Sequence, residues 1–184
     1  MISREEAFSL LKKYLRDDKL IKHSLAVEAI MKEMGRKLGK DEELWGITGL
    51  LHDLDYEYTQ GEPEKHAKIS AQILTGLIPD DALNAIKAHN YMHTDYTPTT
   101  SIDKLLIASD AISGLIVAVA LVMPSKKLAE VRPETLKNKF NDRSFATGCN
   151  RIRIELCLDA GIGVEEFLSI SLNVLKQIAG TLDL

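Results

Sequence analysis

The sequence predicts an all-α protein, on three observations. Apolar residues recur at three- and four-residue intervals through most of the chain, as they do on the buried faces of helices. Capping residues and Gly or Pro breakers separate these segments at intervals typical of helices in globular proteins. No segment shows the apolar–polar alternation of a half-buried strand, and there is no internal repeat or low-complexity tract.

The helices of the N-terminal half are each marked by their own signals. Ser3 and Glu6 form a capping box, Gly39 suits the end of the second helix, and Asp41 caps the third. Polar residues and the Gly-Glu-Pro sequence predict a loop at 55–63, and Pro79 separates the next two helices. The predicted helices cover about 3–14, 18–38, 41–52, 64–77 and 80–89.

A loop rich in Thr, Tyr and Pro at 91–101 leads into the most apolar segment of the chain. The run 105–123 is nearly long enough to span a bilayer, but it contains Asp110, whose burial at mid-membrane would cost about 2.5–3.5 kcal/mol. We therefore expect a buried helix of a soluble bundle, ended by Pro124. Charged helical segments follow at about 133–140, 145–158 and 164–178.

The composition is that of an ordinary soluble globular protein. Hydrophobic residues make up 45% of the 184 residues and charged residues 27%, and the length suits one domain with a sizeable core. The net charge of −4 argues against whole-surface attraction to nucleic acid or an anionic membrane. Cys149 and Cys157 form no C-x-x-C motif, and the N-terminus has no apolar signal region, so we expect a cytoplasmic protein.

Histidine and aspartate residues lie near the apolar faces of five predicted helices. Each has a structural alternative when taken alone, such as a satisfied core histidine for His23 or an exposed first-turn residue for His66. Asp110 has the weakest alternative, because a carboxylate in an apolar helix requires a partner. Helical bundles commonly build metal sites from such inward side chains on facing helices. The candidate ligands are His23, His52, Asp53, His66, His89 and Asp110.

The order of these residues resembles a known family. His23, then His52-Asp53, then Asp110 reproduce the H…HD…D signature of the HD-domain superfamily of metal-dependent phosphohydrolases, and the resemblance runs from about 20 to 118. His66 and His89 are similar to the two further histidines of its binuclear branches. The whole chain looks like a bacterial and archaeal group of predicted HD hydrolases.

The resemblance implies a fold and a metal site. It implies an HD-domain helical bundle in a single domain, 1–184, with a metal-binding core at about 18–123 and additional C-terminal helices at about 124–184. The four signature residues would hold one divalent transition metal, and Asp53 would bridge to a second held by His66 and His89. Imidazole and carboxylate ligands suit Fe, Mn, Co, Ni or Zn.

The implied reaction is hydrolysis of a phosphate ester or anhydride by a metal-activated water. The substrate would be a nucleotide or another small phosphorylated molecule. Cyclic dinucleotides are not expected as substrates. The branch of the family that hydrolyses them continues from HD into Ile-Gly-Lys, whereas this chain has Leu54-Asp55-Tyr56. Asp53 is the first candidate catalytic residue, and Asp55, with Glu57, is a candidate for assisting proton transfer, although loop solvation is an alternative for both.

Basic residues in the C-terminal part offer candidate contacts for phosphate. The segment 125–153 has eight Lys and Arg residues against three acidic ones. Lys126 and Lys127 are selected because they follow the Asp110 helix, with a solvated helix face as the alternative. Nucleic acid is not expected as a partner, since the basic segment lacks interleaved aromatic residues.

Two other functions stay open on the residues alone. Some HD-fold proteins with the same six-ligand set are mixed-valent diiron oxygenases, and the second alternative is a non-catalytic sensor that binds a nucleotide and signals to a partner. Oxygen consumption with reduced iron would separate the first from a phosphohydrolase. The intact signature disfavours the second, and the oligomeric state is left open.

Overall fold

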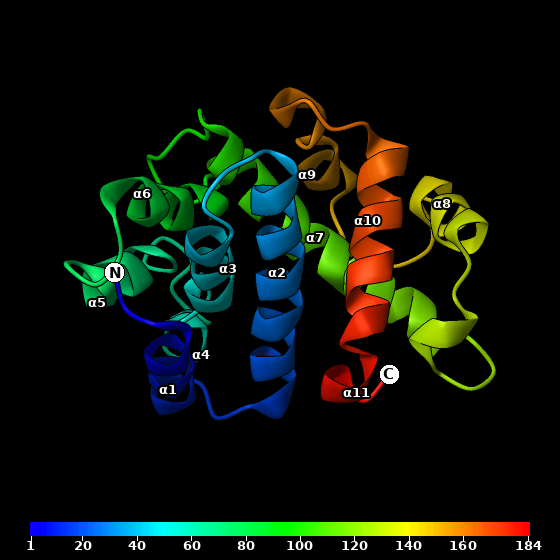
Figure 1. Ribbon diagram of the computed structural model, residues 1–184, viewed down its shortest axis with the longest axis horizontal. Coiled ribbons are helices and arrows are strands. Elements are labelled where there is room, and N and C mark those ends of the chain that lie inside the picture. Colours follow the sequence, from blue (N-terminus) through cyan, green and yellow to red (C-terminus); the bar gives the residue numbers. More distant parts are fainter.

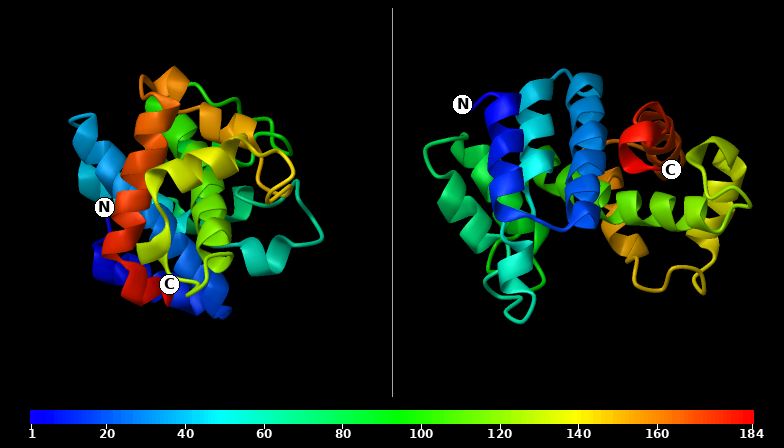
Figure 2. Two further views of the ribbon diagram at one scale, coloured as in Figure 1. Left: turned by 90° about the vertical axis from the view of Figure 1, so that its right-hand side faces the viewer. Right: turned by 90° about the horizontal axis from the view of Figure 1, so that it is seen from below.

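The computed structural model describes residues 1–184 as eleven α-helices and two short 3-10 helices, with no β-sheet (Figure 1). The all-α prediction is therefore confirmed. The long helix α7 (Ser101–Leu121) connects an N-terminal and a C-terminal group of helices, as the view from below in Figure 2 shows. Its N-terminus carries a capping box between Thr100 and Asp103.

The N-terminal group contains all the candidate metal ligands except Asp110 on α7. Helix α2 (Asp18–Lys37) packs against both α3 (Glu42–Leu51) and α7. A Cβ atom on Gly49 would lie 2.8 Å from the carbonyl oxygen of Val27, so the close approach of α3 to α2 requires glycine there. The other helices of this group are α1 (Arg4–Tyr14), α4 (Tyr56–Thr59), α5 (Lys68–Leu74) and α6 (Asp80–His89).

The C-terminal group covers the second half of α7. Helix α10 (Val164–Gln177) packs against α2, α7 and α8 (Pro133–Asn141), and the last residues return to α2, where Lys22 pairs with Asp183 at 2.5 Å. Figure 1 shows α10 beside α2, with α8 on its outer side. The group consists of η1 (Leu128–Glu130), α8 (Pro133–Asn141), α9 (Arg151–Glu155), η2 (Leu158–Ala160), α10 (Val164–Gln177) and α11 (Ala179–Leu182).

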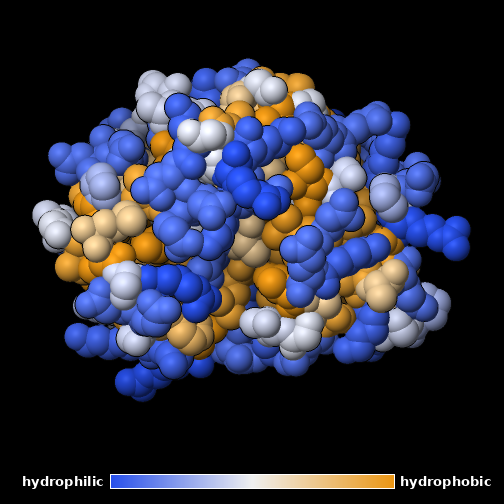
Figure 3. All heavy atoms as spheres, viewed as in Figure 1, coloured by the Kyte–Doolittle hydropathy of each residue, from blue (hydrophilic) through white to orange (hydrophobic).

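Helix α7 is the most apolar helix of the bundle. By length and composition it could cross a membrane, but most of its apolar length is buried inside the protein. That burial is expected of the core helix of a globular bundle. Figure 3 shows hydrophilic residues over much of one face of the molecule, broken by hydrophobic patches near its middle.

Two boundaries in the N-terminal half differ from the sequence prediction. Residues 56–59, expected to lie in a loop at 55–63, form the short helix α4. Glu57 accepts hydrogen bonds of 2.7 Å from two backbone N–H groups of the linker between α1 and α2, which fixes this segment. The helix expected from 64 begins at Lys68, because Ala67 has a φ of +73° and interrupts the helical backbone.

The helix expected at 145–158 is wrong over most of its length, since only α9 (Arg151–Glu155) forms there. Arg151 is 4% exposed, and its guanidinium donates to backbone carbonyls of the preceding loop and of the end of α8. The guanidinium gathers these carbonyl oxygens around one point, whereas the carbonyls of a continuous helix all point along its axis. The acceptors are the carbonyl oxygens of Lys139, Phe140, Asp142, Phe145, Ala146 and Cys149.

Candidate metal centre

The structure brings the six predicted ligands together around the carboxylate of Asp53. They come from five separate places in the chain, and Asp53 is 8% exposed. His23 lies on α2, His52 caps the end of α3, Asp53 lies in the turn that follows, His66 precedes α5, His89 ends α6 and Asp110 lies in the middle of α7. His93, by contrast, is exposed in the loop after α6.

Each of the four imidazoles is held at its Nδ1 atom by an oxygen. A Nδ1–H that donates to an acceptor fixes the ring orientation and leaves a lone pair on Nε2. The acceptors are the Gly49 carbonyl for His52 at 2.8 Å, the Ile86 carbonyl for His89 at 2.5 Å, Asp55 Oδ1 for His66 at 2.8 Å and Ser113 Oγ for His23 at 3.2 Å. The Ser113 hydroxyl in turn donates to the Asp110 carbonyl, which leaves its oxygen free to accept from His23.

The four Nε2 atoms face the two carboxylates. Asp53 Oδ1 lies 3.4 Å from His52 Nε2, 3.3 Å from His66 Nε2 and 3.2 Å from His89 Nε2. His23 Nε2 lies 3.2 Å from Asp110 Oδ1 and 3.6 Å from Asp53 Oδ2. The donor atoms form two groups that share Asp53, one with His23 and His52 and the other with His66 and His89.

The imidazole nitrogens are placed to bind a cation rather than to form hydrogen bonds with one another. His52 Nε2 is buried and has no hydrogen-bond partner. His66 Nε2 and His89 Nε2 lie only 3.1 Å apart, so two lone pairs meet there unless a proton or a metal lies between them. A buried polar atom without a partner costs about 1–3 kcal/mol, which a metal ion would remove. The arrangement therefore suits one or two divalent ions held by imidazole and carboxylate.

Both carboxylates are held in the charged form. Burial would raise the pKa of Asp53, but the surrounding imidazoles, led by His52, keep it well below its ordinary value. Burial is likewise outweighed at Asp110, whose pKa is lowered by its hydrogen bond to His23 and by the charge of Arg153. Two anionic ligands close to one another favour a bound cation.

The histidines respond to the site in opposite directions. Burial lowers the pKa of His52 to about 4, so this ring is neutral at pH 7. At His66 burial is outweighed by hydrogen bonds to Asp53 and Asp55, which raise its pKa to about 10. A proton on His66 and a metal at Nε2 therefore compete for the same lone pair.

Asp55 is buried, although the sequence predicts a polar loop at this position. It is fully buried, Oδ1 faces His66 Nδ1 at 2.8 Å, and Oδ2 accepts from the backbone N–H of Ser70 at 2.9 Å. Both carboxylate oxygens of Asp55 thus have partners, and the contact with Nδ1 suits it to orient the His66 ring. The carboxylate of Glu57 is also occupied by hydrogen bonds, because it accepts from two backbone N–H groups of the linker between α1 and α2.

The structure does not bring Lys126 and Lys127 to the cluster. The eleven residues from Asp110 to the end of α7 correspond to about 17 Å along the helix, and Lys127 Nζ donates to the Asp183 carbonyl instead. The cation that reaches the site is Arg153, whose Nη2 lies 2.7 Å from Asp110 Oδ2 and 3.0 Å from the His89 carbonyl. In the sequence Arg153 is one of eight basic residues in its segment, so only its position in space distinguishes it.

A cleft of about 380 Å³ opens onto the metal-facing atoms. Tyr56 lies at its wall, with its ring edge-on to His66 at 5.5 Å between centroids. Sequence reasoning missed this aromatic residue, because nothing in a polar loop signalled a contact with His66. The cleft is lined by Leu20, His23, Asp53, Tyr56, His66, His89, Asn90, Asp110 and Arg153.

Comparisons with known proteins agree with this geometry. The family profile described as "HD domain" matches residues 20–120. Ribonuclease Y of Bacillus thuringiensis is 33% identical over 96 residues, covering 52% of this chain and 18% of that protein. Ribonuclease Y of Desulfotalea psychrophila is 31% identical over 138 residues, covering 72% and 26%, and that of Nitratidesulfovibrio vulgaris is 35% identical over 96 residues, covering 52% and 18%. The chain thus spans about a quarter or less of these relatives, and no solved structure matches it.

Proposed function

The chain belongs to the HD-domain family of metal-dependent phosphohydrolases, and from this premise we propose that it hydrolyses a small phosphate ester or anhydride, with a nucleotide as the first candidate. The observation that carries the proposal is the common orientation of four buried or half-buried imidazoles, each fixed at Nδ1 and facing two carboxylates through Nε2.

The proposed site assigns a role to each ligand. His23, His52, Asp53 and Asp110 would hold one divalent ion, and Asp53, His66 and His89 would hold a second. Bound there, Fe, Mn, Co, Ni or Zn supplies Lewis acidity that lowers the pKa of water and neutralises phosphoryl oxygens.

Residues around the ligands would maintain the geometry of the site. Asp55 keeps His66 in the tautomer whose Nε2 faces Asp53, and Ser113 does the same for His23. Arg153 holds Asp110 through Oδ2 and leaves Oδ1 facing the imidazoles. The substrate phosphate would enter by the cleft that the metal-facing atoms line.

RNA is a second candidate substrate, because the curated relatives carry the name ribonuclease Y. The distribution of charge favours a small substrate instead. Four of the eight basic residues in 125–153 form ion pairs with carboxylates and Arg151 is buried, so only three of these charges are left unpaired and accessible to a phosphate backbone. The ion pairs are Lys137 with Glu165, Lys139 with Asp142, Arg143 with Glu155 and Arg153 with Asp110.

Phosphate release by the purified chain tests the proposal. The protein is stripped with a chelator, reloaded with Mn, Co, Fe or Ni, analysed for metal, and offered nucleotides, dinucleoside polyphosphates, simple phosphomonoesters and a short RNA. We expect metal-dependent release from a small ester. Preferred cleavage of the RNA would replace the small substrate with the second candidate.

Two further results would overturn the hydrolase assignment. Oxygen uptake by the reduced-iron protein without phosphate release would indicate an oxygenase. Tight binding of a nucleotide by the loaded protein, with no turnover of any compound in the panel, would indicate a sensor.

A further inference from the structure

A second hollow adjoins the cleft over the metal-facing atoms. Its volume is about 470 Å³, which lies within the range of small-molecule sites. It shares His23, Asp110 and Arg153 with the cleft, so a bound molecule could extend from one to the other. Its remaining lining is formed by α7 and the loop before α9, namely Ala111, Gly114, Ala146, Gly148, Cys149 and Asn150.

The hollow is kept open by a glycine that packing does not require. Gly114 lies in the middle of α7, where glycine costs about 1 kcal/mol relative to alanine. A Cβ atom at this position would have no atom within 4 Å, whereas one at Gly49 would meet Val27 at 2.8 Å. Glycine at 49 allows two helices to touch, and glycine at 114 leaves space at the surface.

Arg153 stands between the two spaces with donors to spare. Both of its hydrogen bonds leave from Nη2, which leaves Nη1 without a hydrogen bond, whereas Nε is buried. Its side chain is 24% exposed and lines both the cleft and the hollow. A guanidinium held on one side by a carboxylate and open on the other is suited to a phosphate oxygen.

We propose that Arg153 binds the substrate phosphate and that the hollow beside Gly114 receives the organic group esterified to it, a group of nucleoside size. This inference rests on the proposed phosphohydrolase function and adds the direction in which the substrate lies. The phosphate faces the metal ligands through the cleft, and the organic group lies over α7 against the loop before α9. The small residues of that wall leave room for a flat group.

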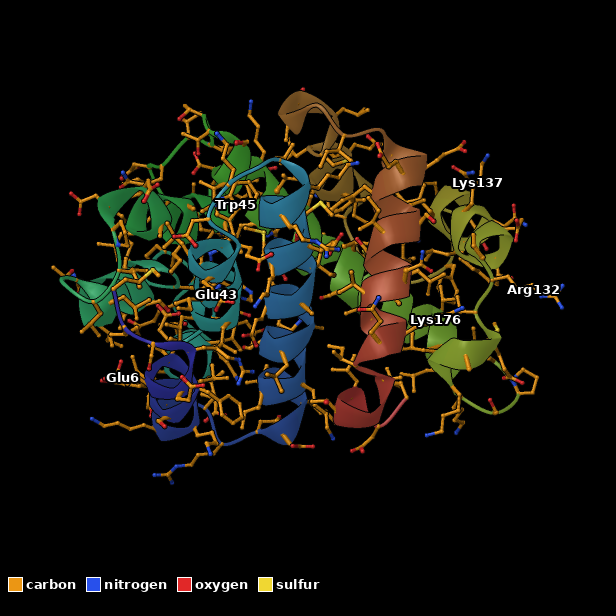
Figure 4. All side chains as sticks on the ribbon, in the orientation of Figure 1. Glu6, Glu43, Trp45, Arg132, Lys137 and Lys176 are labelled. Carbon is orange, nitrogen blue, oxygen red and sulfur yellow. The ribbon has the colours of Figure 1, made fainter.

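The neighbouring Arg151 shows that this role is specific to one arginine of the pair. Arg151 donates hydrogen bonds to carbonyls of the loop that forms one wall of the hollow. It therefore shapes the subsite without facing it. Arg132 is exposed, and Figure 4 shows it with Lys137 around α8, at the outer edge of the molecule. Arg132 therefore provides a matched control for loss of a positive charge.

The first test compares Arg153→Gln with Arg132→Gln in the Mn-loaded full chain. The probe is inorganic phosphate, its binding is measured by calorimetry, and bound metal is measured by elemental analysis. We expect about a ten- to a hundredfold weaker phosphate binding in Arg153→Gln, with metal content retained and partial recovery in Arg153→Lys. Arg132→Gln should bind phosphate as the unchanged protein does.

The second test narrows the hollow from α7. Ala111→Leu and Gly114→Leu put a large side chain at its wall, and Gly114→Ala serves as the control that leaves most of the space. The probes are a nucleoside phosphonate, whose P–C bond resists hydrolysis, and inorganic phosphate. We expect both leucine variants to bind the phosphonate at least about tenfold more weakly and to bind phosphate normally. Circular dichroism verifies that the variants are folded.

The outcomes separate this inference from the proposed function. Unchanged phosphate binding in Arg153→Gln, or loss of metal without any loss of phosphate affinity per loaded site, would reduce Arg153 to a support for Asp110. Unchanged phosphonate binding in both leucine variants would remove the subsite. Either result is compatible with normal hydrolysis, whereas an unaltered protein that binds the phosphonate as expected and hydrolyses nothing contradicts only the proposed function.

Discussion

The metal-binding core and the C-terminal group use charged residues in opposite ways. At the metal site of the core, charged side chains are buried or half-buried and held at short distances, as Asp53 and Asp55 show. In the C-terminal group they are many and mostly paired at the surface, as Lys137 is with Glu165. A rare charge in an apolar segment indicates function from its context, whereas one charge among many does not.

Two arginines on α9 repeat this contrast within five residues. Arg151 is 4% exposed and its donors are taken up by loop carbonyls. Arg153 lies two residues further on, contacts Asp110 through Nη2 and lines the cleft, with no hydrogen bond from Nη1. The residue type is the same, and only the surrounding chain decides that one stabilises a loop and the other faces a site.

The largest expected effect breaks the core at its shared ligand. In Asp53→Asn a neutral amide replaces the carboxylate that both donor groups share, so bound metal and turnover should fall together. We expect a greater loss than the roughly 10²–10³-fold that follows removal of one oxyanion-hole donor. Elemental analysis and phosphate release measure it, with the exposed Asp95→Asn as control. Full metal content and turnover in Asp53→Asn would refute the site.

The next largest effect breaks the C-terminal group without touching the ligands. Arg151→Met removes a buried guanidinium and leaves the carbonyls of Phe145, Ala146 and Cys149 without this donor. We expect a loss of about 1–3 kcal/mol in the free energy of unfolding, because buried carbonyl oxygens lose a donor. Urea denaturation measures it. If Arg153→Met lowers the free energy of unfolding as much as Arg151→Met does, the proposed difference between the two arginines is refuted.

A smaller effect distinguishes a positioning residue from a ligand within the core. Asp55→Ala removes the acceptor of His66 Nδ1–H, so the ring is no longer held with Nε2 toward Asp53. We expect about a 10–100-fold loss of metal affinity, with turnover restored at saturating metal and an unchanged pH profile. An altered pH profile at full metal occupancy would instead indicate that Asp55 transfers a proton.

Two glycines sharpen the comparison further, because the same substitution should have opposite signs at them. Gly49→Ala places a methyl group 2.8 Å from the Val27 carbonyl and should destabilise the protein by about 1–3 kcal/mol. Gly114→Ala meets no atom within 4 Å and should stabilise it by up to about 1 kcal/mol. Thermal denaturation of the two variants decides between a tight and an open position.

The most gradual effect is the pH dependence of the chelator-treated protein. The pKa of His66 is raised to about 10, so its stabilisation is complete below the unfolded value of 6.5 and is lost as pH rises toward 10. The pKa of His52 is lowered to about 4, so stability is also lost as pH falls from 6.5 toward 4. Each group contributes a slope of at most about 1.4 kcal/mol per pH unit.

Unfolding followed from pH 4 to pH 10 should therefore show a maximum near the unfolded histidine value of 6.5. A saturating divalent metal should remove the loss at high pH, because the ion takes the place of the proton on His66. Equal slopes with and without metal would show that the ion does not bind at this ring.

The sequence by itself determined the helices and the kinds of residue in the site. Helical periodicity and caps such as Ser3 with Glu6 depend on neighbours three and four residues away, so they can be predicted from the sequence alone. The cost of burying Asp110 in an apolar helix is equally local and required a partner before any partner was known.

Only the tertiary structure decided how those residues are used. The approach of α3 to α2 at Gly49, the buried place of Asp55 and the choice of Arg153 over Lys126 all depend on contacts between segments far apart in the chain. The loop before α9 departed from its helical pattern because Arg151 draws its carbonyls inward. Such contacts carry no periodic signal, since packing between elements rather than the order of residues sets their energy.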